Sequence, residues 1–210
     1  MRIITIVDYG SGNIRSVYNA LKLINNDKYK IQVSSDPIDI KKTDKIILPG
    51  VGAFGDCIDS LSKISNMTDV LKEEVVAKKK SFLGICVGMQ LLADFGYEHG
   101  KKLGLGFIPG KVVKIDSESG KLKIPQIGWN NIKIEKDHYI LGGISCNEHF
   151  YFVHSYHFVP SSCDDIIATV DYGKKLTSII AKNNIIATQF HPEKSGESGI
   201  KLLKNFISHE

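Results

Sequence analysis

Four short apolar runs, separated by segments with helical spacing, dominate the first half of this chain. The runs are Ile3–Val7, Lys30–Val33, Lys45–Leu48 and Ser81–Ile85. A strand with little alternation between apolar and polar residues is typical of one covered on both faces. Because strands that alternate with helices return to one sheet by crossovers, this order predicts an α/β fold with a mostly parallel central sheet between helix layers.

Apolar residues recur at helical spacing after several of these runs, and they predict the helices of that fold. We expect a helix marked by Ile14, Val17, Tyr18, Leu21 and Ile24, a helix marked by Val70, Leu71 and Val75 that ends in the lysine run 78–80, a helix over Val87–Phe95, and a final helix marked by Ile200, Leu203, Phe206 and Ile207. Together they would supply both helix layers.

The second half has a different pattern, with short segments rich in Val, Ile, Phe and Tyr between turn residues. These segments are Lys111–Ile115, Asn131–Ile134, Phe150–Val153, Ile166–Val170, Leu176–Ala181 and Ile185–Phe190. Such spacing predicts hairpins and an added antiparallel or mixed sheet. Since no linker or internal repeat interrupts the chain, we expect residues 1–210 to form a single domain.

Composition excludes several classes of function. The net charge of +4 is small and dispersed, which argues against binding to nucleic acid or a membrane surface. No apolar stretch approaches the roughly 18 residues of a membrane span, and Met1–Asp8 lacks a signal-peptide cleavage site. The four cysteines have neither metal-type spacing nor disulfide density, so we expect a cytoplasmic protein.

A cysteine lies between two glycines where an apolar strand is expected to turn into a helix, in Gly84-Ile85-Cys86-Val87-Gly88. A sharp strand-to-helix turn exposes and fixes a nucleophile, and flanking glycines permit close backbone approach. The helix start would favour the thiolate of Cys86, and the Val87 N–H would point toward an oxyanion formed there. Taken alone, the pattern is equally compatible with a small buried cysteine in a glycine-rich turn.

An imidazole and a carboxylate follow the last apolar strand, in His191-Pro192-Glu193. Alternate residues of an extended chain face the same way, so Glu193 could orient His191 as a base for a thiol. A loop histidine beside a solvated glutamate is the alternative. His154 and His157 could indicate a metal pair, but no third ligand is evident and we expect no metal site.

Together with the loop Pro49-Gly50-Val51-Gly52, these motifs resemble class I, triad-type glutamine amidotransferases, most closely the glutaminase subunits of imidazole glycerol phosphate synthases. The resemblance extends over nearly the whole chain and includes Asp8-Tyr9-Gly10-Ser11-Gly12-Asn13, Ile127-Gly128-Trp129-Asn130, His154-Ser155-Tyr156 and Gln189-Phe190-His191-Pro192-Glu193-Lys194-Ser195. It implies a three-layer, flavodoxin-like α/β fold with no cofactor.

The resemblance also implies the chemistry. Cys86 would attack the side-chain amide of L-glutamine, with His191 as base and Glu193 orienting it. The N–H groups of Gly52 and Val87 would form the oxyanion hole, and a donor of this kind contributes about 2.7–4 kcal/mol to lowering the barrier. Substrate-binding positions would be Gly52, Gln90, Ser155 and Tyr156.

A partner is implied as well: a (β/α)8-barrel cyclase that receives the ammonia in a heterodimer and makes imidazole glycerol phosphate and an aminoimidazole carboxamide ribotide. Asn13, Trp129 and Lys194 match its docking face. This chain has Pro125-Gln126 where the family usually has Pro-His, at a position expected to lie toward the partner. Ammonia supply for sugar amidation, or a stand-alone cysteine hydrolase of γ-glutamyl bonds, therefore remain alternatives.

Overall fold

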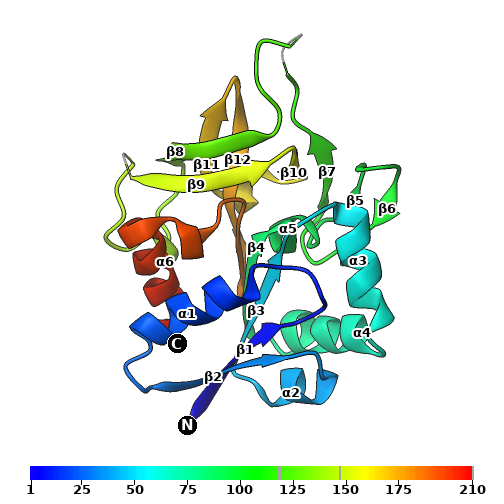
Figure 1. The fold of residues 1–210 in the computed structure, drawn as a ribbon, viewed down its shortest axis with the longest axis vertical. Helices are drawn as coiled ribbons and strands as arrows, with labels where there is room; N and C mark the ends of the chain where they lie inside the picture. The colour runs from blue at the N-terminus through cyan, green and yellow to red at the C-terminus, as the bar shows by residue number, and fades with distance from the viewer. Residues whose placement is uncertain (118–119, 147, 210) are drawn as a thin grey trace.

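A nine-stranded mixed sheet forms the centre of the protein in the computed structural model, which describes residues 1–117, 120–146 and 148–209 (Figure 1). Its strand order is β2-β1-β3-β4-β13-β12-β11-β8-β9. The strands are β1 Arg2–Val7, β2 Tyr29–Ser34, β3 Lys45–Gly50, β4 Ser81–Cys86, β8 Gln126–Ile134, β9 His149–His154, β11 Ile166–Tyr172, β12 Lys174–Lys182 and β13 Ile185–Thr188. All six segments predicted in the second half lie in or overlap described strands.

The first five strands in this order pair in parallel, as the strand–helix alternation predicts. Gly50 pairs with Cys86 between β3 and β4, and Ile85 pairs with Thr188 between β4 and β13. Strands β3, β4 and β13 therefore end side by side, and the residues that follow them meet at one edge of the sheet. Ligand sites of open α/β sheets lie outside this carboxyl edge.

The antiparallel strands of the second half extend the central sheet beyond β13. A separate sheet has the order β10-β7-β5-β6. Its strands are β5 Phe95–Gly96, β6 Lys102–Leu103, β7 Gly110–Lys114 and β10 Tyr156–Pro160. Only Ser155 separates β9 from β10, so the chain passes from one sheet to the other at that residue.

Helices cover both faces of the parallel strands. Helix α1 (Ile14–Ile24) packs against α6 (Gly196–Ser208) on one side of the sheet, and α3 (Phe54–Lys63) and α4 (Met67–Leu71) lie on the other (Figure 1). The short helix α2 (Pro37–Lys42) follows β2. The expected layer of helices on each face is therefore confirmed. Within the described residues, no helix has the length and apolar character needed to cross a membrane.

The helix predicted over Val87–Phe95 is wrong beyond its first turn. Helix α5 spans only Val87–Gln90, and Phe95 belongs to β5. The carbonyls of residues 91–93 accept hydrogen bonds from the backbone of residues 105–108, for example Leu105 N–H to Leu91 O at 2.8 Å. Tertiary backbone pairing thus replaces the hydrogen bonds that would continue the helix.

The helix predicted around Val70 and Val75 is present, but its second half is π-helical. Helix α4 ends at Leu71, and a π-helical segment, η1 (Lys72–Ala77), continues it to the lysine run. Lys78 and Lys80 make ion pairs of 2.7 and 2.8 Å with Glu74, whose side chain is buried. Helices α2 and α3 were not predicted from the sequence.

Candidate active site

Cys86 lies at a sharp turn between β4 and α5, at the carboxyl edge of the sheet. Its backbone has φ 55° and ψ −111°, a conformation that L residues rarely adopt and that costs on the order of 1–3 kcal/mol. A Cβ at Gly88 would collide with the Leu48 carbonyl, and one at Gly84 would lie 2.8 Å from the Gly88 carbonyl oxygen. Both glycines of the motif are therefore required by the close packing of this turn.

His191 and Glu193 are in direct contact. The imidazole Nδ1 lies 2.8 Å from Glu193 Oε1, and the two side chains are 1% and 0% exposed. The sequence predicted that an extended chain would bring the two side chains together, and this is wrong. Residues 192–194 form a 3₁₀ turn, η4. The bend brings the carboxylate back toward the ring that precedes it.

Surrounding groups hold this turn rigidly. The Ser195 hydroxyl donates to the His191 carbonyl at 2.6 Å, and the His191 N–H donates to the Tyr151 carbonyl at 3.0 Å. The ring of Phe190 packs against Phe150, with centroids 4.2 Å apart. The backbone of His191 is thus fixed by β9 and by its own turn.

The electrostatic surroundings favour a charged imidazole. Burial lowers the pKa of His191, but interactions with Cys86 and Glu193 outweigh burial and raise that pKa above its ordinary value. His191 Nε2 is buried and makes no hydrogen bond to any described residue. One ring nitrogen is therefore held by Glu193, while the other remains available for proton exchange on the Cys86 side.

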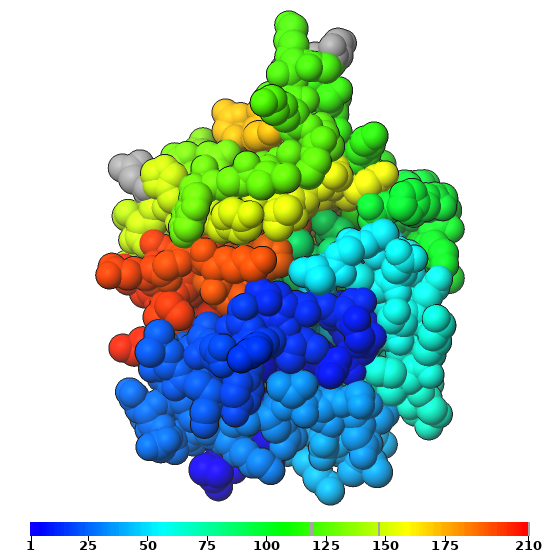
Figure 2. Space-filling view, viewed as in Figure 1, coloured from blue at the N-terminus to red at the C-terminus, as the bar shows by residue number. Residues whose placement is uncertain are grey.

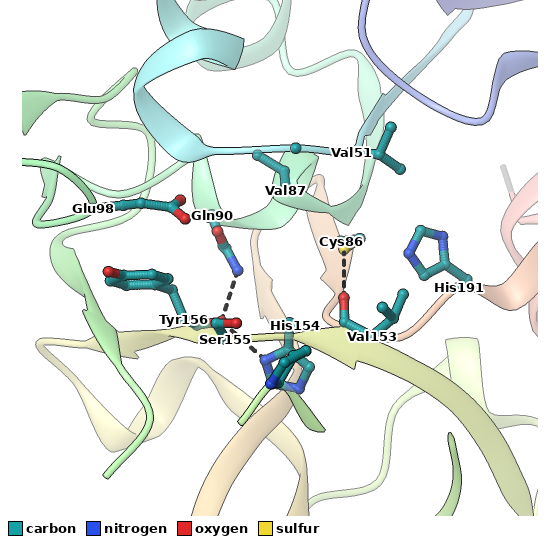
Figure 3. Close-up of a pocket in the computed structure, with 12 residues that line it drawn as sticks. Val51, Cys86, Val87, Gln90, Glu98, Val153, His154, Ser155, Tyr156 and His191 are labelled. Carbon is teal, nitrogen blue, oxygen red and sulfur yellow. Dashed lines mark hydrogen bonds between the residues drawn. The ribbon is translucent and has the colours of Figure 1, made fainter. Parts of the chain in front are cut away.

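A cavity of about 250 Å³ opens beside Cys86 (Figure 3). Its lining comes from the ends of β4 and β9, the start of β10, helix α5 and the neighbouring loops: Val51, Gly52, Cys86, Val87, Gln90, Glu98, Pro125, Val153, His154, Ser155, Tyr156 and His191. The structure thus brings together every sequence-predicted catalytic, oxyanion-hole and substrate-binding residue except Glu193. Glu193 does not line this cavity but contacts His191, which does.

Comparison with known proteins agrees with this arrangement. The family described as Glutamine amidotransferase class-I matches residues 5–209.

The chain belongs to the class-I glutamine amidotransferases.

Several relatives of this amidotransferase carry the name imidazole glycerol phosphate synthase subunit HisH. The protein of Pelagibacter ubique is 49% identical, over 98% of this chain and 99% of the relative. The protein of Rhodospirillum rubrum is 45% identical, over 97% of each chain, and HisH 1 of Methanococcus maripaludis is 46% identical, over 97% and 98%.

Solved structures share the fold at low sequence identity. The structure of PurLQS from Thermotoga maritima has a TM-score of 0.74 at 17% identity and covers 99% of this chain and 98% of that one. The glutaminase domain of CTPS from Trypanosoma brucei, with bound acivicin, has a TM-score of 0.66 at 15% identity, with 100% and 95% covered. The predicted three-layer amidotransferase fold is confirmed.

In this amidotransferase, a chain of amide groups links Cys86 to the far side of the cavity. Gln90 Nε2 donates to the Tyr156 carbonyl at 2.8 Å and to Gln189 Oε1 at 3.1 Å, and Gln189 Nε2 lies 3.8 Å from Cys86 Sγ. The role of Gln189 was not predicted from the sequence. The alternation that placed His191 at the strand end would also place Gln189 on the same side, two residues earlier.

Glu98 is a second lining residue that the sequence analysis missed. It supplies the acidic side chain of the cavity lining, and its Oε2 accepts the Phe54 N–H at 2.7 Å. That bond joins the loop after β5 to the start of α3. Nothing in the local sequence marks Glu98, because it reaches the cavity only through the arrangement of the second sheet.

Gln126, which was expected to lie toward the partner, is buried within this chain. Its side chain is 2% exposed and approaches His154 Nε2 at 3.0 Å, while His154 Nδ1 donates to the Tyr156 carbonyl at 2.9 Å. Burial lowers the pKa of His154 to about 4, so the ring is neutral. Nε2 then needs a donor, which the amide N–H of Gln126 supplies when the amide is turned toward it.

The three predicted interface residues gather on one face. The Trp129 ring is 56% exposed and packs edge-on against Tyr151, with centroids 6.0 Å apart, and Lys194 Nζ lies 5.9 Å from the same Tyr151 ring. Asn13 Nδ2 donates to Glu193 Oε1 at 3.2 Å. In Figure 2 the orange segment that carries Lys194 lies between the blue α1 segment and the green-to-yellow β8 and β9.

No metal site emerges from the part of the chain that the structure describes. Groups of three or more His, Cys, Asp or Glu side chains with ligand geometry are absent from those residues. His154 is occupied by Gln126 and the Tyr156 carbonyl.

Proposed function

We propose that this chain is the glutaminase subunit of an imidazole glycerol phosphate synthase and hydrolyses L-glutamine to glutamate and ammonia. The observation that carries the proposal is Cys86 on a strained turn, beside a buried His191–Glu193 pair, in a cavity of about 250 Å³. A thiol with a base that is oriented by a carboxylate is the arrangement of nucleophilic acyl transfer.

Transfer of the Cys86 thiol proton to His191 would give a thiolate–imidazolium pair, which the raised pKa of His191 favours. The thiolate attacks the side-chain amide carbon, and the N–H groups of Gly52 and Val87 stabilise the oxyanion that forms. His191 then protonates the departing nitrogen, which leaves as ammonia. Water, deprotonated by His191, hydrolyses the γ-glutamyl thioester and restores the thiol. Glu193 holds the imidazolium that forms in each half-reaction.

The cavity lining would recognise the amino-acid end of glutamine by charge and hydrogen bonds. The carboxylate of Glu98 is suited to the α-ammonium group, because an ionised acceptor binds a cationic donor with about twice the strength of a neutral pair. Ser155 and Tyr156 also line the cavity, and Gln90 donates to the Tyr156 carbonyl (Figure 3). Gln90 donates to Gln189 Oε1 as well. Gly52 borders the reacting end of the substrate.

We further propose that a (β/α)8-barrel synthase subunit docks on the face formed by Asn13, Trp129 and Lys194, and takes the ammonia directly. Free ammonia is mostly protonated at neutral pH, so direct transfer preserves its reactivity. The hydrogen bond from Asn13 to Glu193 would connect this face to the catalytic pair. All four cysteines are free thiols, which suits a reducing compartment and supports a cytoplasmic location for this single-domain subunit.

The test measures glutamate formation by the full chain, with and without the barrel subunit and its nucleotide substrate. We expect activity that rises strongly with the partner and disappears in Cys86→Ala, while Cys163→Ala, a change at an exposed cysteine, is unaffected. Activity that the partner does not change would point to a stand-alone hydrolase. No glutamate under any condition would contradict the glutaminase itself.

A further inference from the structure

Two buried donors hold the carbonyls of the loop that follows β3. The Tyr9 hydroxyl donates to the Pro49 carbonyl at 2.8 Å, and the Cys57 thiol donates to the Val51 carbonyl at 3.4 Å. Tyr9 is 4% exposed and Cys57 is fully buried. We refer to these two hydrogen bonds, from Tyr9 and Cys57 to the loop of residues 49–52, as the loop clamp.

By holding the Pro49 and Val51 carbonyls, the loop clamp fixes the orientation of the two peptide groups to which they belong. In a trans peptide the carbonyl of one residue and the N–H of the next point to opposite sides. Holding the Val51 carbonyl on the side of Cys57 therefore directs the Gly52 N–H away from Cys57. Gly52 lines the cavity and Cys57 does not, so we infer that the side of the loop opposite Cys57 faces the cavity.

Packing ties the same loop to the residue after the nucleophile. A Cβ at Gly50 would lie 2.7 Å from the Tyr9 hydroxyl oxygen, 2.9 Å from Val87 Cβ and 2.8 Å from the Gly88 nitrogen. Gly50 is thus wedged between Tyr9 and the first turn of α5. A shift of Tyr9 would move the loop relative to Val87, and an oxyanion hole depends on the spacing of its two donors.

Both donors keep their protons at neutral pH. Burial raises the pKa of Tyr9, and the neighbouring Cys57 raises it further. Burial also raises the pKa of Cys57, against smaller opposing contributions from Tyr9 and Ser11. A thiolate or phenolate would repel the carbonyl that it faces, whereas the neutral groups can donate to it.

We propose that Tyr9 and Cys57 are positioning residues, which hold the Gly52 N–H toward the cavity and thereby set the rate of glutamine hydrolysis. The inference rests on the proposed glutaminase function, and it assigns to Cys57 a role other than packing. Neither side chain lines the cavity. The expected signature is a loss in kcat with little change in KM, because the oxyanion develops only in the transition state.

Tyr9→Phe removes the first hydrogen bond, and Tyr29→Phe provides a matched control. The Tyr29 hydroxyl donates to the Ile207 carbonyl at 2.6 Å, in a buried site that joins β2 to α6 away from the cavity. Measured with the synthase partner bound, kcat should fall about tenfold or more in Tyr9→Phe, with KM within about twofold. Tyr29→Phe should keep most of its activity. Equal losses in the two variants would overturn the proposal.

Cys57 is tested by a pair of variants. Cys57→Ser retains a donor for the Val51 carbonyl and should keep kcat close to that of the unmodified chain, whereas Cys57→Ala should lose kcat in the same way as Tyr9→Phe. Iodoacetamide alkylation of Cys86 passes through no oxyanion, so its rate should be unchanged in both. A slower alkylation would mean that Cys86 itself had moved, and the proposal would be wrong.

A measurement that does not depend on glutaminase activity separates this inference from the proposed function. Hydrogen–deuterium exchange in the full chain should rise in the segment of residues 49–53 in Tyr9→Phe and Cys57→Ala, but not in Tyr29→Phe. Unchanged exchange there would overturn the loop clamp even in an active enzyme. Raised exchange in a chain that never hydrolyses glutamine would retain the clamp and contradict only the proposed function.

Discussion

The imidazole of His191 and the carboxylate of Glu193 form a 2.8 Å contact with essentially no exposure to solvent. Because Glu193 also accepts from Asn13, its orientation is fixed from two sides. Such a pair sets which nitrogen of the ring carries the proton and stabilises the imidazolium. Its removal should therefore affect the reaction more than the fold.

Glu193→Gln should lower kcat by about 10²- to 10⁴-fold, the range typical of acid–base catalysis. The amide keeps the shape of the side chain but can no longer stabilise a charged ring. Steady-state kinetics with saturating partner measures the loss. Glu197→Gln, at an exposed position of α6, is the control and should be neutral. Unchanged turnover in Glu193→Gln would remove Glu193 from the catalytic set.

Glu98→Gln should weaken the binding of glutamine and leave kcat largely unchanged. Losing the negative charge weakens a contact with the α-ammonium group by about 1.5–3 kcal/mol, which corresponds to a rise in KM of roughly 10- to 100-fold. The amide oxygen can still accept the Phe54 N–H, so α3 should stay in place. Initial rates over a range of glutamine concentrations separate KM from kcat. A loss in kcat alone would place Glu98 outside the substrate contact.

The sequence predicted the sheet well because its strands have a recognisable apolar pattern. Buried strands such as β1 and β3 are largely apolar, and burial on both faces leaves that pattern in the chain. The candidate nucleophile was recognisable for a related reason: the glycines beside Cys86 are required by contacts within a few residues of the turn and with the adjoining strand β3.

What the sequence could not predict depends on contacts between distant segments. Helix α5 stops at Gln90 because residues 105–108 pair with the chain that follows it, and no local pattern records that competition. Glu98 reaches the cavity through the second sheet, and Cys57 reaches Val51 through the packing of α3. The turn at residues 192–194 likewise overrides the extended geometry expected for His191 and Glu193.

The buried neutral imidazole of His154 should make stability depend on pH. Burial lowers its pKa to about 4 in the folded state, while an unfolded histidine titrates near 6.5. The unfolded chain therefore binds the extra proton first, so the contribution is complete above about pH 6.5 and is lost as the pH falls toward 4. At about 1.4 kcal/mol for each pH unit, the loss in the free energy of unfolding approaches roughly 3 kcal/mol.

Urea unfolding between pH 4 and 7 tests this dependence, with His154→Gln as the comparison. The variant lacks the titrating ring, so its free energy of unfolding should fall less over the same range. His157, whose pKa burial also lowers to about 4, remains in both proteins and cancels in the difference. Parallel curves for the two proteins would mean that His154 is not the group responsible.

Trp129→Ala should weaken docking of the synthase subunit by about 2 kcal/mol or more, since exposed aromatic residues that become buried at an interface carry much of its affinity. Its ring is 56% exposed and rests on Tyr151, so the fold should lose little. Leu103→Ala is the matched control, because Leu103 is 75% exposed on β6 of the other sheet. Calorimetric titration with the barrel subunit measures both. Equal affinity for the two variants would place the docking surface elsewhere, and a weaker Trp129→Ala complex with full activity at saturation would confine Trp129 to binding.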